Sequence, residues 1–176
     1  MLKLILGHGA LAGVIVGVPL FGLTVALNGH PPLKYGVLLG YLTMLIALSL
    51  VFVAIKRRRD ADLGGVIRFW PAFGLGLGIS VVAGLVYVLA WEAALAVTHM
   101  DFAADYAKAV LERQRAAGAD AQALARSAAQ MAQFQIDYAK PLYRLGMTFA
   151  EIFPVGLLVS LVSAGLLRDS RFLPAR

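Results

Sequence analysis

Long runs of apolar residues separated by polar stretches dominate the chain. A bilayer core about 30 Å thick needs about 20 apolar residues in a helix, and we looked for uninterrupted runs of that length. Four such runs occur, at residues 5–27, 35–55, 69–97 and 142–167. Because no backbone polar group can go unpaired in lipid, each run is predicted to be a helix that spans the membrane.

Polar or turn-forming residues bound each run. The first is followed by residues 28–32, which contain a glycine and two prolines, and the second by the charged residues 56–60. Residues 99–101 and 168–169 follow the other two. A secretory signal is the alternative interpretation of the first run, but the run exceeds the roughly 7 to 15 apolar residues of such a segment, so we expect a retained span.

The polar segment between the third and fourth runs, residues 98–141, predicts two helices. Asp101 suits the N-cap of a first helix, Gly118 interrupts it, and Asp120 suits the N-cap of a second helix that ends near residue 138. Pro141 suits the first turn of the last span. Apolar side chains at helical spacing would pack the two helices into a hairpin: Phe102, Tyr106, Val110, Leu124, Ala128, Met131, Phe134 and Tyr138.

The distribution of Lys and Arg predicts the orientation in the membrane. The chain has 16 Lys and Arg against 10 Asp and Glu, a net charge of +6. Nine of the 16 fall on one predicted side, at position 3, at 56–59, at 68 and in the tail at 168, 171 and 176. Basic residues in short connections stay in the cytoplasm, so both termini are predicted to be cytoplasmic and the hairpin extracytoplasmic. The charge is thus a topology signal and does not indicate nucleic-acid binding.

Composition excludes several classes of protein. A chain that is 60% hydrophobic and 15% charged, with a mean hydropathy of +0.78, is not a water-soluble monomer. The absence of cysteine excludes disulfides, thiolate metal sites and a cysteine nucleophile. His8 is predicted to lie at the opposite end from His30 and His99, and no metal motif occurs. We therefore expect no metal and no cofactor, with a site between His30 and His99 as a minor alternative.

The turn between the second and third runs carries a family resemblance. It reads Lys56-x-x-Arg59-Asp60-x-x-Leu63-Gly64-Gly65, and a glycine-rich span, a polar helical segment and a basic tail follow it. This order resembles the bacterial integral membrane family catalogued as domain of unknown function 4199, over nearly the whole chain. Position 58 departs from the pattern, since an aromatic residue is expected where Arg58 stands. The resemblance implies a four-span protein of the bacterial inner membrane and transfers no catalytic residues.

Glycines spaced four apart predict where helices pack closely. Such spacing puts the glycines on one helix face, where another backbone can approach. Packing within one copy is the favoured interpretation, and a dimer interface the alternative. Because several spans carry such faces, we also expect a homo-oligomer. The predicted packing positions are Gly9, Gly13 and Gly17 in the first span, Gly36 and Gly40 in the second, and Gly74 and Gly78 in the third.

Three ionisable residues near the outer ends of the third and fourth spans form the candidate functional cluster. Ionisable side chains in a membrane are functional candidates by default. Arg144 is predicted to pair with Glu92 or Glu151, and Glu151 to face protein rather than lipid. The favoured interpretation is a structural clasp between the two spans. The alternative is a proton or substrate site, to which a kink at Pro154 would contribute.

Two functions from different classes follow from these features. The first is a non-enzymatic membrane protein whose extracytoplasmic hairpin contacts a protein partner or a second subunit. The alternative is a small transporter or channel component that uses Glu151, Arg144 and the Pro154 kink. A membrane-embedded enzyme acting on lipid has little support beyond Glu92 and Glu151. A cavity that reaches Glu151 would favour transport, and a closed, glycine-packed bundle would favour the first reading.

Overall fold

The computed structural model describes residues 1–28 and 35–174, and the regular elements in these ranges are all helical. They are α1 (Leu2–Ala26), α2 (Gly36–Arg57), the π-helical turn η1 (Arg58–Asp62), α3 (Phe69–Thr98), α4 (Phe102–Ala116), α5 (Ala121–Tyr138) and α6 (Pro141–Leu167). Four segments are long and apolar enough to cross a membrane: α1, α2 continued by η1, α3 and α6. The predicted all-α fold with four membrane-spanning helices is confirmed.

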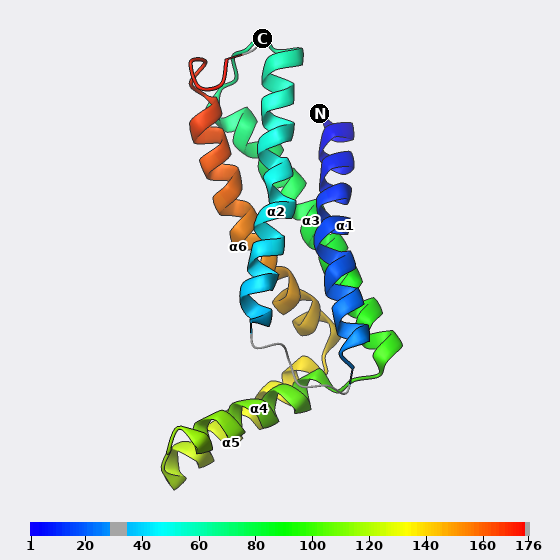
Figure 1. Cartoon of the computed structure of the whole chain (residues 1–176), viewed down its shortest axis with the longest axis vertical. Helices are drawn as coiled ribbons and strands as arrows, with labels where there is room; N and C mark the ends of the chain where they lie inside the picture. The colour runs from blue at the N-terminus through cyan, green and yellow to red at the C-terminus, as the bar shows by residue number, and fades with distance from the viewer. Residues whose placement is uncertain (29–34, 175–176) are drawn as a thin grey trace.

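The four long helices form a bundle, and α4 and α5 leave it at one end (Figure 1). Within the bundle, α3 packs against both α1 and α6, and α2 packs against α1 and α6. The start of α1, the turn η1 and the end of α6 lie at the end of the bundle opposite the hairpin. The basic residues near the start of α1, in η1 and near the end of α6 therefore lie at one end of the bundle, as the predicted orientation requires.

Helix α2 is longer than predicted. The apolar run was expected to end at residue 55, but the helix continues through Lys56 and Arg57 into η1. Lys and Arg are good helix formers, so charge ends the apolar run without ending the helix. Most of the turn predicted at residues 28–32 lies outside the described residues. Its first residue, Asn28, donates from Nδ2 to the carbonyl of Thr98 at 3.2 Å and so ties the end of α1 to that of α3.

The first glycine stripe lies directly against α3. A Cβ atom built at Gly13 would lie 2.4 Å from Cβ of Val86, and one at Gly9 would lie 2.6 Å from Cβ of Val82. Gly17 stands in the same relation to Cβ of Ala90, at 2.9 Å. These distances are too short for any side chain, so the backbones of the two parallel helices approach as closely as the glycine spacing predicts.

The other predicted glycines differ among themselves. Gly78 lies against Ile5, with its built Cβ 3.0 Å from Cδ1 of that side chain. Gly40 and Gly74 have nothing within 4 Å of such an atom, so neither glycine lies at a close helix contact in this structure. Gly74 lies one turn before Gly78, where the parallel α1 has not yet begun. Gly36 is half-buried at the start of α2.

A reciprocal contact of small residues joins α3 to α6. Cβ atoms built at Gly76 and Gly156 would lie 2.9 Å from Oγ of Ser160 and 2.6 Å from Cβ of Ser80. Each serine donates to the carbonyl of the glycine four residues before it, and the two hydroxyl oxygens lie 3.3 Å apart. Both buried hydroxyls are therefore hydrogen-bonded where the helices meet. The four-residue glycine spacing did not predict this contact, because each glycine here meets a serine of the other helix.

The local signals for the two hairpin helices are confirmed. Oδ1 of Asp101 accepts from the backbone N–H of Ala104 at 3.0 Å, and Oδ1 of Asp120 accepts from that of Ala123 at 2.6 Å. Gly118, between the helices, has a φ of +79°. This left-handed conformation favours glycine and explains why the first helix ends there. Pro141 begins α6 as predicted.

The side of α5 that faces α4 differs from the predicted one at a single position. Ser127 is buried, whereas Ala128, predicted to face α4, is exposed. The inward positions are Leu124, Ser127, Met131, Phe134 and Tyr138. Alternating steps of three and four residues place these side chains along one face of α5, toward the partner helix. The prediction counted apolar residues only and therefore passed over the serine.

Candidate functional site

An aromatic cluster fastens the hairpin to the bundle. We call it the aromatic joint; it comprises Trp91 of α3, Phe102 and Tyr106 of α4, and Phe134 and Tyr138 of α5. The rings of Trp91 and Phe102 meet edge to face with centroids 5.1 Å apart, and Phe102 lies 5.4 Å from Tyr138. Nε1 of Trp91 donates to Oη of Tyr138 at 2.8 Å. The first turn of α4 and the last turn of α5 are thereby held on α3.

Tyr138 is the central residue of the aromatic joint. Burial raises the pKa of its hydroxyl, and the hydrogen bond from Trp91 acts in the opposite direction. The guanidinium carbon of Arg144 lies 5.9 Å from the centroid of the same ring, within the range of a cation–π contact. The neutral phenol therefore connects the hairpin both to α3 and to the first turn of α6.

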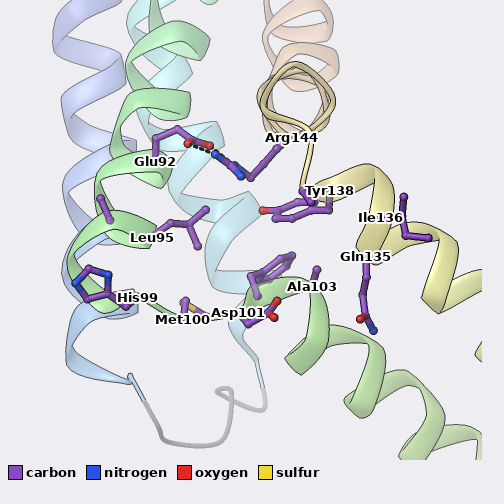
Figure 2. A pocket seen from close by; sticks show the side chains of 13 residues that line it. Glu92, Leu95, His99, Met100, Asp101, Ala103, Gln135, Ile136, Tyr138 and Arg144 are labelled. Carbon is purple, nitrogen blue, oxygen red and sulfur yellow. Dashed lines mark hydrogen bonds and ion pairs between the residues drawn. The ribbon is translucent and has the colours of Figure 1, made fainter.

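Arg144 pairs with Glu92, the first of its two predicted partners. Nε donates to Oε1 at 2.7 Å and Nη2 donates to Oε2 at 2.6 Å, and Figure 2 shows the two side chains reaching toward each other from α6 and α3. Two parallel bonds from a planar guanidinium make a strong and directional ion pair. The pair has the geometry of the predicted clasp between the third and fourth spans.

An open cavity lies between this ion pair and the hairpin (Figure 2). Its volume is about 690 Å³, and its walls come from the end of α3, the start of α4 and the end of α5. Polar groups from all three helices line it, among them Glu92, His99, Asp101 and Gln135. His99 ends α3 in a left-handed conformation with a φ of +52°, which turns the chain toward the hairpin.

Glu151 does not join the ion pair. Its Oε2 accepts a hydrogen bond from Oη of Tyr87 at 3.1 Å, and the residue lines a second cavity of about 300 Å³. Tyr138 and Phe102 line both cavities, so the aromatic joint lies between them. The structure thus brings Glu92 and Arg144 together and leaves Glu151 apart from them, exposed and beside a cavity in which half of the lining residues are aromatic. Helix α6 continues through Pro154 without ending.

The histidines do not converge in the described part of the chain. No group of three metal-ligating side chains occurs among residues 1–28 and 35–174. Nδ1 of His8 lies 3.1 Å from the carbonyl oxygen of Leu4, within its own helix. His30, the other residue of the alternative site with His99, lies outside the described residues.

A second polar site, which sequence reasoning missed, lies at the other end of the bundle. The Arg59 side chain is 0% exposed. Its Nε donates to Oδ1 of Asp60 at 2.6 Å, and Nη1 donates to the carbonyls of Phe172 at 2.9 Å and Leu167 at 3.5 Å. Nη2 donates to the carbonyl of Leu173. One buried guanidinium therefore binds the C-terminal tail to the end of α2.

The turn around Arg59 explains the motif that carries the family resemblance. Asp60 also accepts from Nζ of Lys56, so one carboxylate faces two cations. The N–H of Gly65 donates to the carbonyl of Arg59 at 2.8 Å, and both Gly64 and Gly65 have positive φ. Two consecutive left-handed residues favour glycine and close the turn back on Arg59. The basic residues of this turn indicate topology by their charge alone, whereas Asp60 and the glycine pair are the sequence features that indicate an ordered turn.

The comparisons with known proteins give one match. A family model described as a protein of unknown function, DUF4199, matches residues 8–169. The matched range contains the Arg59 turn, both cavities and the whole hairpin. Neither a curated protein nor a solved structure matches the chain.

Proposed function

The chain belongs to the DUF4199 family, whose function is unknown, and we propose that it is a non-enzymatic protein of the bacterial inner membrane that acts through the hairpin α4–α5. In this proposal the hairpin lies outside the cytoplasm and binds a protein subunit there. The observation that carries it is the shape of the molecule: the hairpin stands away from the bundle and has its own packed seam (Figure 1). The aromatic joint holds its base in one orientation, as a binding arm requires.

The outward side of α5 is the face that we propose for binding. Small or apolar residues recur on it at helical spacing and are all exposed; they are Ala121, Ala125, Ala128, Ala132 and Ile136. Ile136 is 58% exposed. Alanines let another helix approach closely, while the exposed side of α4 carries charged residues such as Lys108 and Glu112. A second copy of this chain or another helical protein would find its closest approach on α5.

Site-specific photo-crosslinking in native membranes tests this proposal. A photoreactive residue at Ala128 or Ala132 should give a discrete adduct, and the same residue at Glu112 on α4 should not. An adduct with the mass of two chains would identify a homo-oligomer, and a heavier discrete adduct a protein partner. If both faces behave alike, or if no position on α5 gives a discrete adduct, the hairpin does not bind as proposed.

The orientation of the protein has its own test. The proposal requires cytoplasmic termini and is supported by the basic residues grouped at the end opposite the hairpin. The chain has no cysteine, so single cysteines can be placed at Ala61, beside the Arg59 turn, and at Ala119, at the hairpin tip. In intact cells an impermeant thiol reagent should label the Ala119 site alone. Labelling of the Ala61 site before the cells are opened would reverse the topology.

A transporter or channel component remains the second candidate. The observation that favours it is the cavity beside Glu151. Two other observations argue against a transport path between α3 and α6. Arg144 is paired with Glu92, and α3 and α6 are in close contact at Gly76 and Gly156. If the protein is a transporter or channel component, Glu151 is the residue that we propose to bind the transported substrate, on one side of the bundle.

A further inference from the structure

The lining of the cavity beside Glu151 has the composition of a site for an organic cation. Four of its eight residues are aromatic, namely Tyr87, Trp91, Phe102 and Tyr138. A methionine and a leucine complete the apolar part, and the only ionisable carboxyl group is that of Glu151. Aromatic walls around one carboxylate are how proteins recognise ammonium groups. We propose that this cavity binds an organic ammonium group. Binding in the cavity does not depend on the contacts with a partner protein proposed above for the outward side of α5.

The carboxylate lacks a cationic partner among the described residues. Glu151 accepts a hydrogen bond from the hydroxyl of Tyr87, and no Lys or Arg in the described ranges forms an ion pair with it. The nearest guanidinium of the candidate cluster, that of Arg144, is held by Glu92 through two hydrogen bonds. Glu151 is exposed and lines the cavity, so an ammonium group bound there can reach the carboxylate and supply its counter-charge.

The polar ends of Trp91 and Tyr138, two of the aromatic residues that line the cavity, are hydrogen-bonded to each other. Nε1 of Trp91 donates to Oη of Tyr138, so the indole N–H needs no ligand to satisfy it. What the two rings offer is their apolar and π surface. Tyr138 already has the Arg144 guanidinium within cation–π range, at 5.9 Å from the ring centroid. These rings therefore favour a cation with methyl or methylene groups over a strongly hydrated metal ion.

The size and place of the cavity limit the ligand further. A volume of about 300 Å³ accommodates a group such as choline or ethanolamine, at the lower end of the range for small-molecule sites. An anion would be repelled by the carboxylate of Glu151, and a neutral molecule would leave the charge of that carboxylate uncompensated. The cavity adjoins the hairpin end of the bundle, which both a soluble amine and the amine of a lipid headgroup can approach. The shared chemistry is an ammonium group.

The decisive comparison is between choline and its neutral analogue 3,3-dimethyl-1-butanol, which has nearly the same shape. The chain has two tryptophans, so Trp70→Phe makes Trp91 the sole reporter in the cavity. In an uncharged maltoside detergent, choline should change the fluorescence of Trp91 saturably. The neutral analogue should bind at least about tenfold more weakly, because the cation–π and charge contributions are lost. Equal affinities, or no saturable response to choline, would overturn the proposal.

Three variants test the assigned roles. Glu151→Gln keeps the shape and an acceptor for Tyr87, and should weaken choline binding at least about tenfold. Asp105→Asn removes an exposed carboxylate of α4 outside the cavity and is the matched control, with no change expected. Tyr87→Phe removes the hydrogen bond but not the charge, so binding should persist. Loss of binding in Asp105→Asn equal to that in Glu151→Gln would contradict the site. If Glu151→Gln does not fold, the choline comparison in the otherwise unaltered chain still decides.

Nanodiscs distinguish the two sources of the ammonium group. The fraction of phosphatidylglycerol is held constant, and phosphatidylethanolamine is exchanged for an uncharged glycolipid. If the lipid amine occupies the cavity, choline binds more weakly in the discs that contain phosphatidylethanolamine. Equal, saturable binding in both discs assigns the cavity to a soluble amine. Absence of choline binding in both discs would reject the ammonium site in a lipid bilayer.

Discussion

Replacing Arg59 with alanine will detach the C-terminal tail and lower the free energy of unfolding by about 1 to 3 kcal/mol, the cost of leaving hydrogen-bond acceptors without their donor. The guanidinium donates to Asp60 and to the carbonyls of Phe172 and Leu173 from a fully buried position. Its removal leaves those carbonyls without their donor and Asp60 with Lys56 alone. Unfolding of the purified protein in mixed detergent, with limited proteolysis of the tail, measures both effects.

Arg58→Ala is the matched control for this prediction. Arg58 is the adjacent residue, but its side chain is partly exposed and its contact with Asp62, at 3.4 Å, joins exposed groups. Exposed pairs contribute about 0 to 1 kcal/mol, so this variant should unfold close to the parent. Arg59→Lys should not restore stability, because a lysine ammonium cannot reproduce the planar fork that reaches four acceptors. If Arg58→Ala and Arg59→Ala lower the free energy of unfolding by similar amounts, the buried contacts of Arg59 do not contribute to stability as predicted.

Alanine at Gly13 will weaken the contact between α1 and α3 and lower the free energy of unfolding by about 1 to 3 kcal/mol, the usual cost of overpacking. The added Cβ would lie 2.4 Å from Cβ of Val86 and 3.1 Å from the carbonyl oxygen of Ala83. Neither atom is the end of a flexible side chain, so one of the two helices must move. The loss is measured by unfolding in detergent.

Gly22→Ala is the control on the same helix and should have the opposite sign. A Cβ built at Gly22 has nothing within 4 Å, so the substitution meets no neighbour. Alanine is favoured over glycine inside a helix by up to about 1 kcal/mol, and this variant should be slightly more stable than the parent. If the two substitutions shift the unfolding transition in the same direction, the close approach at Gly13 does not limit stability.

Features that depend on neighbouring residues alone could be predicted from the sequence. The length of an apolar run determines whether a helix can cross the bilayer, so the four spans followed from counting residues. The caps at Asp101 and Asp120 and the break at Gly118 depend on the side chain and the backbone within one turn. The ends of helices were less predictable, because Lys56 and Arg57 end an apolar run but favour a helix.

Which face of a helix turns inward required the tertiary structure. Gly74 and Gly78 are equivalent in spacing, but only Gly78 has α1 beside it, because α1 begins too late to reach the other. Ala128 is apolar and exposed, whereas Ser127 beside it is buried in the seam between α4 and α5. Periodicity locates a set of equivalent positions, and the register between helices selects among them.

The sequence by itself determined that this chain is a bundle of four membrane-spanning helices with a pair of polar helices between the third and the fourth, because bilayer thickness, hydropathy and caps act on local segments. The tertiary structure alone decided that Arg144 binds Glu92, that Glu151 lines an aromatic cavity with Tyr87, and that Arg59 holds the C-terminal tail. Arg59 and Phe172 are 113 residues apart in the chain. Pairings across such separations depend on how whole helices are placed against each other, and no spacing within one helix encodes that placement.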